Sequence, residues 1–190
     1  SDVARGAALM TGTKVNIRVV SAYADFLSVP VMDEVMENSM IDSYPIEYTE
    51  EEYKYASQFN TKEYELSGNI DASYEKGKKS VSAGSTDVAD VSWIAPTGSI
   101  TVTTMAKDST MHGWSVVAQG KSSIAHKGMH RAADILSQAA LKVIESPELQ
   151  KKIKEDFERS KAGEEYSSLL PANVKDRKST RLNSSHGYIS

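Results

Sequence analysis

The stretch SSIAHKGMHRAADILSQAALKVIE (residues 122–145) carries the strongest structural signal in this chain of 190 residues. Small and apolar side chains recur along it at helical spacing and form one narrow stripe: Ile124, Gly128, Ala132, Leu136, Ala139, Ala140 and Val143. This repeat predicts a helix from about 124 to 145. Because most of the stripe is glycine and alanine, we expect the helix to pack closely against a sheet.

The flanking sequence contains start signals for further helices. Ser146 followed by Pro147 predicts a helix that runs to about Lys161, since proline is favoured at the first helical position. Thr49 with Glu52 three residues later forms a capping-box pattern, which predicts another helix start. Upstream, one face of a predicted amphipathic helix is formed by residues at helical spacing: Met32, Val35, Met36, Ser39 and Met40. Pro45 follows the end of this pattern.

Two segments alternate between apolar and polar side chains, which predicts strands. Residues 13–20 (TKVNIRVV) place three apolar side chains on one face and polar ones on the other. Residues 98–105 (GSITVTTM) are rich in β-branched residues and alternate in the same way. Residues 3–10 read as the last turns of a helix closed by Gly12. Strands that alternate with helices predict a fold of the α/β class.

The overall composition excludes several classes of protein. A formal net charge of −4 leaves no basic surplus for nucleic acid or an anionic membrane surface. No apolar stretch approaches the roughly 20 residues that a transmembrane helix requires. Cysteine is absent, which excludes disulfides, a thiolate nucleophile and a thiolate metal site in this sequence. A chain without cysteine favours a cytoplasmic location.

The last residues, 176–190, read DRKSTRLNSSHGYIS and resemble the translation of a sequencing adapter. The alternative interpretation is a basic, serine-rich tail that binds a partner. We interpret the segment as an adapter artefact and exclude it from reasoning about the fold.

Histidine is the residue type most relevant to chemistry here, and it is scarce. His126 and His130 lie four apart on the predicted long helix, a spacing that can hold one metal, but they fall off its apolar stripe and fit a solvated face better. His112 follows a predicted strand and lies in a loop, where α/β enzymes gather catalytic side chains. Asp87 and Asp90 could act as an acid and base pair, although a capping role explains Asp87 as well.

Four segments in order resemble one family. They are ARGAALMTGT (residues 4–13), GSTDVADVSW (84–93), MHGW (111–114) and GKSSIAHKGM (120–129). Together they are similar to the aminoacylase-like amidohydrolases of peptidase family M-twenty, and the resemblance spans most of residues 3–175.

The resemblance implies a specific architecture. Residues 1–28 would form the end of an inserted α+β lid, or dimerisation, domain and would contribute its last helix and strand. Residues 29–175 would form the C-terminal half of a three-layer α/β catalytic domain. Partners implied are a small-molecule amide substrate and a second protein chain, as a homodimer or hetero-oligomer through the lid.

The resemblance also implies a chemistry. Enzymes of this family use a divalent metal pair, zinc or manganese, to activate water and cleave N-acyl or N-aroyl amino acids, aminobenzoyl-glutamate-like amides or small dipeptides. His112 matches the family's last metal ligand, and Ser85, Thr86 and Asp87 match a loop that shapes the substrate pocket. The general-base glutamate and other ligands lie upstream in the family, so we expect no catalytic residue in this piece and no activity from it alone. A non-catalytic binding or structural relative is the alternative.

Overall fold

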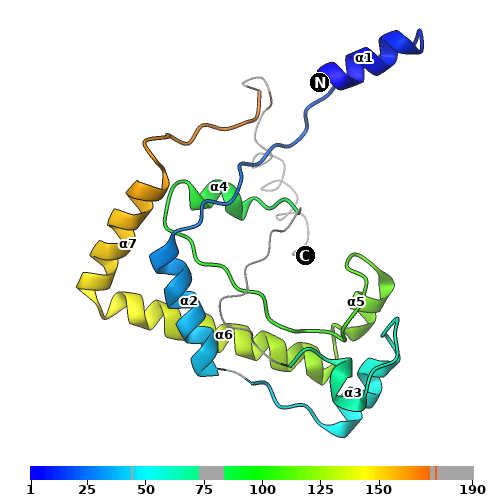
Figure 1. Ribbon diagram of the computed structural model, residues 1–190, viewed down its shortest axis with the longest axis vertical. Helices are drawn as coiled ribbons and strands as arrows, with labels where there is room; N and C mark the ends of the chain where they lie inside the picture. The colour runs from blue at the N-terminus through cyan, green and yellow to red at the C-terminus, as the bar shows by residue number, and fades with distance from the viewer. Residues whose placement is uncertain (44, 73–83, 172–173, 175–190) are drawn as a thin grey trace, which may run out of the picture.

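The computed structural model describes residues 1–43, 45–72, 84–171 and 174, and the regular structure in these ranges is helical (Figure 1). The elements in chain order are α1 (Asp2–Met10), α2 (Pro30–Ser43), α3 (Glu50–Ser57), the 3-10 helix η1 (Leu66–Asn69), α4 (Val88–Ser92), α5 (Trp114–Gln119), α6 (Ser123–Ile144) and α7 (Pro147–Ser160). The artefact assigned to residues 176–190 lies outside the described residues.

The prediction of an α/β fold with a three-layer catalytic domain is wrong for the described residues. Residues 13–20 and 98–104 are extended, but neither segment forms a strand. A strand needs a ladder of backbone hydrogen bonds to a neighbour. In the described ranges, no backbone hydrogen bond joins residues 14–20 or 98–105 to another segment. The predicted lid strand is therefore a single extended segment, and its apolar side chains, such as Val15, remain about two-fifths exposed.

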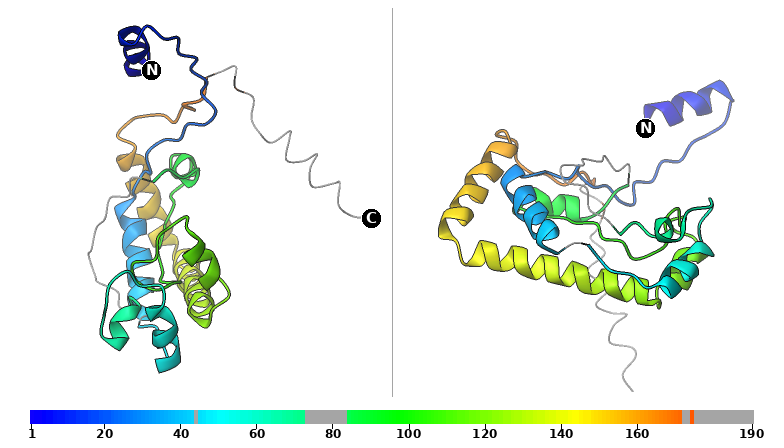
Figure 2. Two further views of the ribbon diagram at one scale, coloured as in Figure 1. Left: turned by 90° about the vertical axis from the view of Figure 1, so that its right-hand side faces the viewer. Right: turned by 60° about the horizontal axis from the view of Figure 1, so that its bottom comes forward.

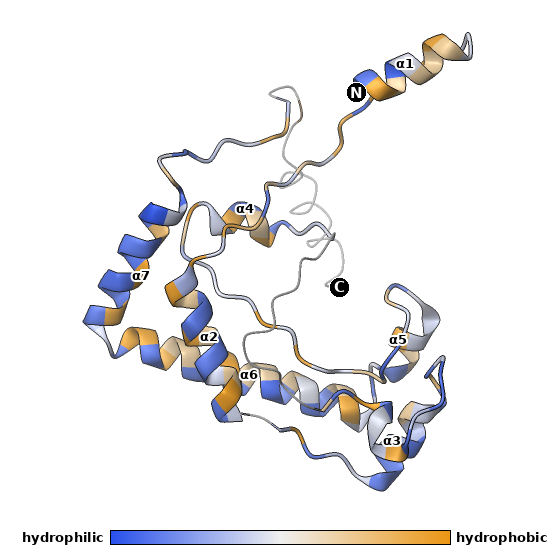
Figure 3. Cartoon of the chain, in the orientation of Figure 1, coloured by the Kyte–Doolittle hydropathy of each residue, from blue (hydrophilic) through white to orange (hydrophobic). Residues whose placement is uncertain are grey.

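The predicted long helix is confirmed as α6, which runs along the bottom of the helical body in the right-hand view of Figure 2. α2 packs across it, and the two helices share an apolar cluster of buried residues: Val35, Met36, Ile135 and Ala139. The predicted stripe is slightly misplaced, because Ile135 is fully buried and Leu136 is 48% exposed. A hydropathy colouring shows apolar and polar residues alternating along α6 (Figure 3).

The extended segment 98–104 crosses α6 at Gly128. A Cβ atom at this glycine would stand 2.2 Å from the carbonyl oxygen of Thr103, closer than any real Cβ contact. Ile100 and Val102 of the same segment pack against the α2 and α6 cluster. The small residue in α6 thus allows close packing, as predicted, but onto one extended segment and not onto a sheet.

α7 joins this body through a buried carboxylate. The predicted cap is confirmed: Ser146 accepts a hydrogen bond from the Leu149 N–H, with Pro147 at the start of the helix. Asp156 of α7 is 2% exposed and accepts a hydrogen bond of 2.8 Å from the backbone N–H of Val31. It thereby supplies the α2 start with a negative charge, which the positive end of a helix dipole favours.

A second apolar cluster lies toward the other end of α6, under α3. Its buried members are Ala56, Ile70, Ala106 and Ile124, and tyrosines and Phe59 pack around them. The capping box predicted at Thr49 and Glu52 is confirmed and starts α3. This cluster positions the loop that follows residue 105 against the first turn of α6.

The N-terminal residues lie apart from this body. α1 has no buried residue, and the chain continues from it as an extended segment to Val29, which is fully buried (Figure 1). Near its end the segment is held to α4, where Asp90 and Ser92 accept hydrogen bonds from the backbone N–H groups of Ala24 and Leu27. The boundary predicted between residues 28 and 29 stays a prediction. Within the described ranges, every helix is too short or too polar to cross a membrane.

Candidate functional site

His112 lies in a loop, as its sequence position predicted, and this loop joins the extended segment 98–104 to α5. Its side chain is exposed, and its backbone has a φ of 61°, in the left-handed region that residues other than glycine adopt rarely. Asp108, four residues earlier, has the same φ. Backbone conformations of this kind cost free energy and cluster at functional sites, which makes the loop a candidate for function.

Two apolar side chains close to His112 in the sequence are exposed to solvent. Met111, directly before it, is 60% exposed, and Trp114, two residues after it, is 77% exposed. Trp114 contacts Phe59, with ring centroids 6.1 Å apart, which links the loop to the end of α3. In the described part of the chain, the imidazole of His112 has no hydrogen bond to another side chain.

A metal ion at His112 would need donors that the described residues do not supply. An imidazole suits zinc, but a protein zinc site has three or four protein ligands. Nowhere in the described ranges do three histidine, aspartate or glutamate side chains group closely enough to hold a metal ion. The described residues therefore do not form a metal site by themselves. His126 and His130 are both exposed on α6, as expected for a solvated face.

The predicted pocket residues Ser85, Thr86 and Asp87 lie at the start of α4. All three are exposed, and the Thr86 hydroxyl accepts a hydrogen bond of 3.3 Å from the Val88 N–H. Asp87 occupies the N-cap position of α4 without a side-chain cap hydrogen bond. α4 and the loop of His112 lie apart in all views, and the structure does not bring these residues together with His112 (Figures 1 and 2). Their roles stay predictions.

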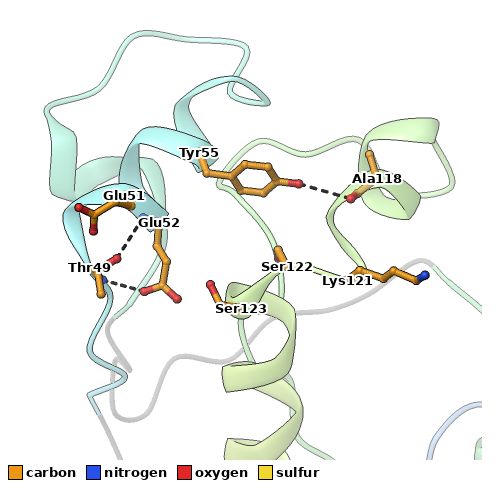
Figure 4. Close-up of a pocket in the computed structure, with 8 residues that line it drawn as sticks. All are labelled: Thr49, Glu51, Glu52, Tyr55, Ala118, Lys121, Ser122 and Ser123. Atoms are coloured by element: carbon orange, nitrogen blue, oxygen red, sulfur yellow. Dashed lines mark hydrogen bonds between the residues drawn. The ribbon is translucent and has the colours of Figure 1, made fainter.

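A pocket that the sequence did not predict opens between the starts of α3 and α6, with a volume of about 670 Å³ (Figure 4). We call it the α3/α6 pocket; its lining is Thr49, Glu51, Glu52, Tyr55, Ala118, Lys121, Ser122 and Ser123. The Tyr55 hydroxyl donates a hydrogen bond of 3.3 Å to the Ala118 carbonyl across it. The capping box at Thr49 and the serine pair that opens α6 were its signals in the sequence.

Glu52 is the buried charge of this pocket. It bonds to the Lys127 ammonium at 2.6 Å and to the backbone N–H of Thr49 at 2.7 Å. Burial raises the pKa of the Glu52 carboxyl, but the hydrogen bonds from Lys127, Ser123 and the Thr49 backbone outweigh it and hold the pKa below its ordinary value. Lys127 also donates to the Glu47 carbonyl at 2.9 Å, so this pair joins the α3 start to α6.

The Glu52 carboxylate should make stability depend on pH at acidic values. Because its pKa is lower in the folded chain than in the unfolded one, its contribution is present above the unfolded pKa near 4.5 and is lost as pH falls through the folded value. We expect Glu52→Gln to lower the unfolding free energy at pH 7 and to flatten its fall in acid. Urea unfolding between pH 3 and pH 7 measures both; Glu50→Gln, which alters an exposed ion pair of the same helix, should leave the profile unchanged. An equally steep profile for Glu52→Gln would contradict this assignment.

Comparison with known proteins gives one informative result. The chain is 27% identical, over 201 aligned residues, to one of the subunits of p-aminobenzoyl-glutamate hydrolase from Escherichia coli (strain K12). The alignment covers 92% of this chain but only 42% of that protein, so the chain spans less than half of its relative's length. No protein-family model matches the chain. No solved structure matches it significantly.

Proposed function

We propose that this chain is part of an amidohydrolase that cleaves N-acyl or N-aroyl amino acids of the aminobenzoyl-glutamate type, or small dipeptides. The observation that carries the proposal is the identity to a p-aminobenzoyl-glutamate hydrolase subunit along 92% of the chain. Hydrolysis of such an amide consumes one water and releases a carboxylate and an amine. Because the chain spans 42% of the relative, the activity belongs to the full-length protein, and this piece alone should be inactive.

Within this function we assign His112 as one ligand of a divalent metal, zinc or manganese. Its support is the exposed imidazole on a left-handed backbone, without a competing hydrogen bond among the described residues. The remaining ligands and the general base would come from outside the described residues. Ser85, Thr86 and Asp87 would contribute to the substrate pocket, which requires other parts of the protein to bridge the space between α4 and the His112 loop.

Replacing His112 by alanine in the full-length protein tests this assignment. Loss of a direct metal ligand should reduce both the bound metal and amide hydrolysis by at least about 100-fold, since even the loss of an outer-shell partner costs 10- to 100-fold. Metal content and the rate of aminobenzoyl-glutamate hydrolysis are the measurements. His130→Ala, which replaces an exposed histidine on α6, is the matched control and should change neither. Wild-type metal content and activity in His112→Ala would end the assignment.

The lone imidazole also supports a second candidate, a non-catalytic relative that binds ligand or assembles with another protein chain. It follows from the lack of a three-ligand group in the described ranges. A full-length wild-type protein that takes up neither zinc nor manganese and hydrolyses no N-acyl amino acid would favour this candidate.

The relative is described by name as a subunit, and we propose that this chain also works in an oligomer, through residues 1–28. In support, α1 buries none of its residues and leaves Val3, Leu9 and Met10 more than four-fifths exposed. Apolar side chains this exposed on one short helix favour a partner surface. Sedimentation of the full-length protein as a single monomeric species would contradict this part of the proposal.

A further inference from the structure

A buried glutamine lies at the base of the loop that carries His112. Gln119, the last residue of α5, has no exposed surface. Its Oε1 accepts a hydrogen bond of 2.7 Å from the backbone N–H of Ala106. Its Nε2 donates two, to the Ser109 hydroxyl and to the Ser115 carbonyl, each at 3.0 Å. Both donors of this side-chain amide are therefore used, and its oxygen is paired.

These bonds close a ring between the loop and α5. The Ser109 hydroxyl, which accepts from Gln119, donates in turn to the Ala106 carbonyl at 2.8 Å. Ala106 is thus held by both its N–H and its carbonyl, and it is itself 2% exposed. Because Gln119 is tied to residues 106, 109 and 115, it spans the loop from its first residue to the first turn of α5.

The next residue of the loop is fastened by other groups. The Lys107 N–H donates a hydrogen bond of 2.9 Å to the Asn69 carbonyl, and the Lys107 carbonyl accepts one of 2.8 Å from the Asn60 side-chain amide. Beyond Ser109 the loop has fewer bonds; within it the Gly113 N–H donates to the Thr110 carbonyl at 3.2 Å. His112 lies in this less supported part, between the attachments at Ser109 and Ser115.

An apolar side chain at position 119 would fill the same space but leave the Ala106 N–H buried without a partner. A buried polar group with all its hydrogen bonds made favours one conformation of the surrounding backbone, because any other conformation breaks a buried hydrogen bond and costs free energy. The left-handed residues Asp108 and His112 both lie inside the span that Gln119 closes. A backbone strained at two positions persists only where its surroundings determine it.

We propose that Gln119 is a positioning residue for His112: its buried amide anchors the loop at Ala106 and Ser109 and to the first turn of α5, and so limits where the intervening residues can place the imidazole. The functional meaning of this inference rests on the proposed role of His112, whereas the claim about the loop stands on the hydrogen bonds alone. Gln119 itself is fully buried, so we expect it to act through the loop and not by direct contact with a ligand.

The test is hydrogen–deuterium exchange of the full-length protein, followed in peptides that cover residues 106–113. In Gln119→Met we expect exchange at least roughly tenfold faster in these peptides, since buried hydrogen bonds that hold the loop are lost. The matched control is Ile124→Val, which removes one buried methyl group from the cluster that also contains Ala106 and leaves the hydrogen bonds of Gln119 in place. It should destabilise the protein without a selective change in the loop. Ser109→Ala, which removes one link of the ring, is a milder second variant and should speed exchange in the same peptides.

Zinc binding, measured by calorimetry on the metal-free full-length protein, separates the two claims. Weaker zinc binding in Gln119→Met but not in Ile124→Val supports the positioning role. A third outcome is also informative: Gln119→Met speeds loop exchange, but the separate variant His112→Ala keeps wild-type metal content. This result supports the inference about the loop and overturns the assignment of His112 as a metal ligand. The inference is overturned if exchange in residues 106–113 is no faster in Gln119→Met and Ser109→Ala than in the Ile124→Val control. If Gln119→Met fails to fold, Ser109→Ala alone decides.

Discussion

Gly128→Ala should destabilise the chain by about 3 kcal/mol, the upper part of the range for a side chain forced into a packed interior. The added Cβ would stand 2.2 Å from the Thr103 carbonyl oxygen and 2.8 Å from the Thr104 methyl group. The closest obstacle is backbone, so it cannot rotate away as the end of a flexible side chain would. Residues 98–104 would have to lift off α6, and the contacts of Ile100 and Val102 with the core would be lost with them.

Whether Gly128→Ala lowers or raises the unfolding free energy shows whether close packing or helix propensity dominates at this position. In an exposed helix, the same substitution would stabilise by up to about 1 kcal/mol. Gly6→Ala in α1 is the matched control, because a Cβ there meets nothing within 4 Å. We expect it to be neutral or slightly stabilising. Urea unfolding followed by circular dichroism gives both values. A Gly128→Ala variant as stable as wild type would show that residues 98–104 do not lie on α6 in solution.

Asp156→Ala should cost about 2 kcal/mol, the upper end of measured helix-cap losses. The carboxylate is 2% exposed and bonds to the Val31 N–H at the start of α2, so its removal leaves that N–H without a partner and takes a negative charge from the helix end. Arg159, which pairs with the same carboxylate, is 75% exposed and would simply be hydrated. The lost stability therefore comes from the weakened attachment of the α2 start to α7.

Two variants of the same helix sharpen this experiment. Asp156→Asn keeps an oxygen that can accept from Val31 and should recover part of the loss. Glu155→Ala removes an exposed ion pair with Lys151, 3.8 Å long, and should change stability by less than about 0.5 kcal/mol. Thermal unfolding of the three proteins measures the series. Equal losses for positions 155 and 156 would contradict a cap supplied by α7.

The candidate site was only partly predictable. The position of His112 in a loop followed from its neighbours in the sequence, and so did the exposure of His126 and His130, but the short helix α5 that follows was not predicted. The role of Gln119 did not, because a single glutamine has no local pattern and its partners at residues 106 and 109 lie in a different segment. The α3/α6 pocket was missed for the same reason. The cap at Thr49 on one side of the pocket was predicted, but nothing local placed it beside the start of α6.

The sequence by itself determined where α3 and α7 begin, because each cap is made by residues within three or four positions of the helix start. The side chains of Thr49 and Ser146 accept hydrogen bonds from the backbone N–H groups of Glu52 and Leu149, each in the first turn of its own helix. Only the tertiary structure decided the state of residues 13–20 and 98–104, whose alternation fits a strand equally well. A strand exists only when a second segment pairs with its backbone, and in the described residues these segments lie against helices or solvent.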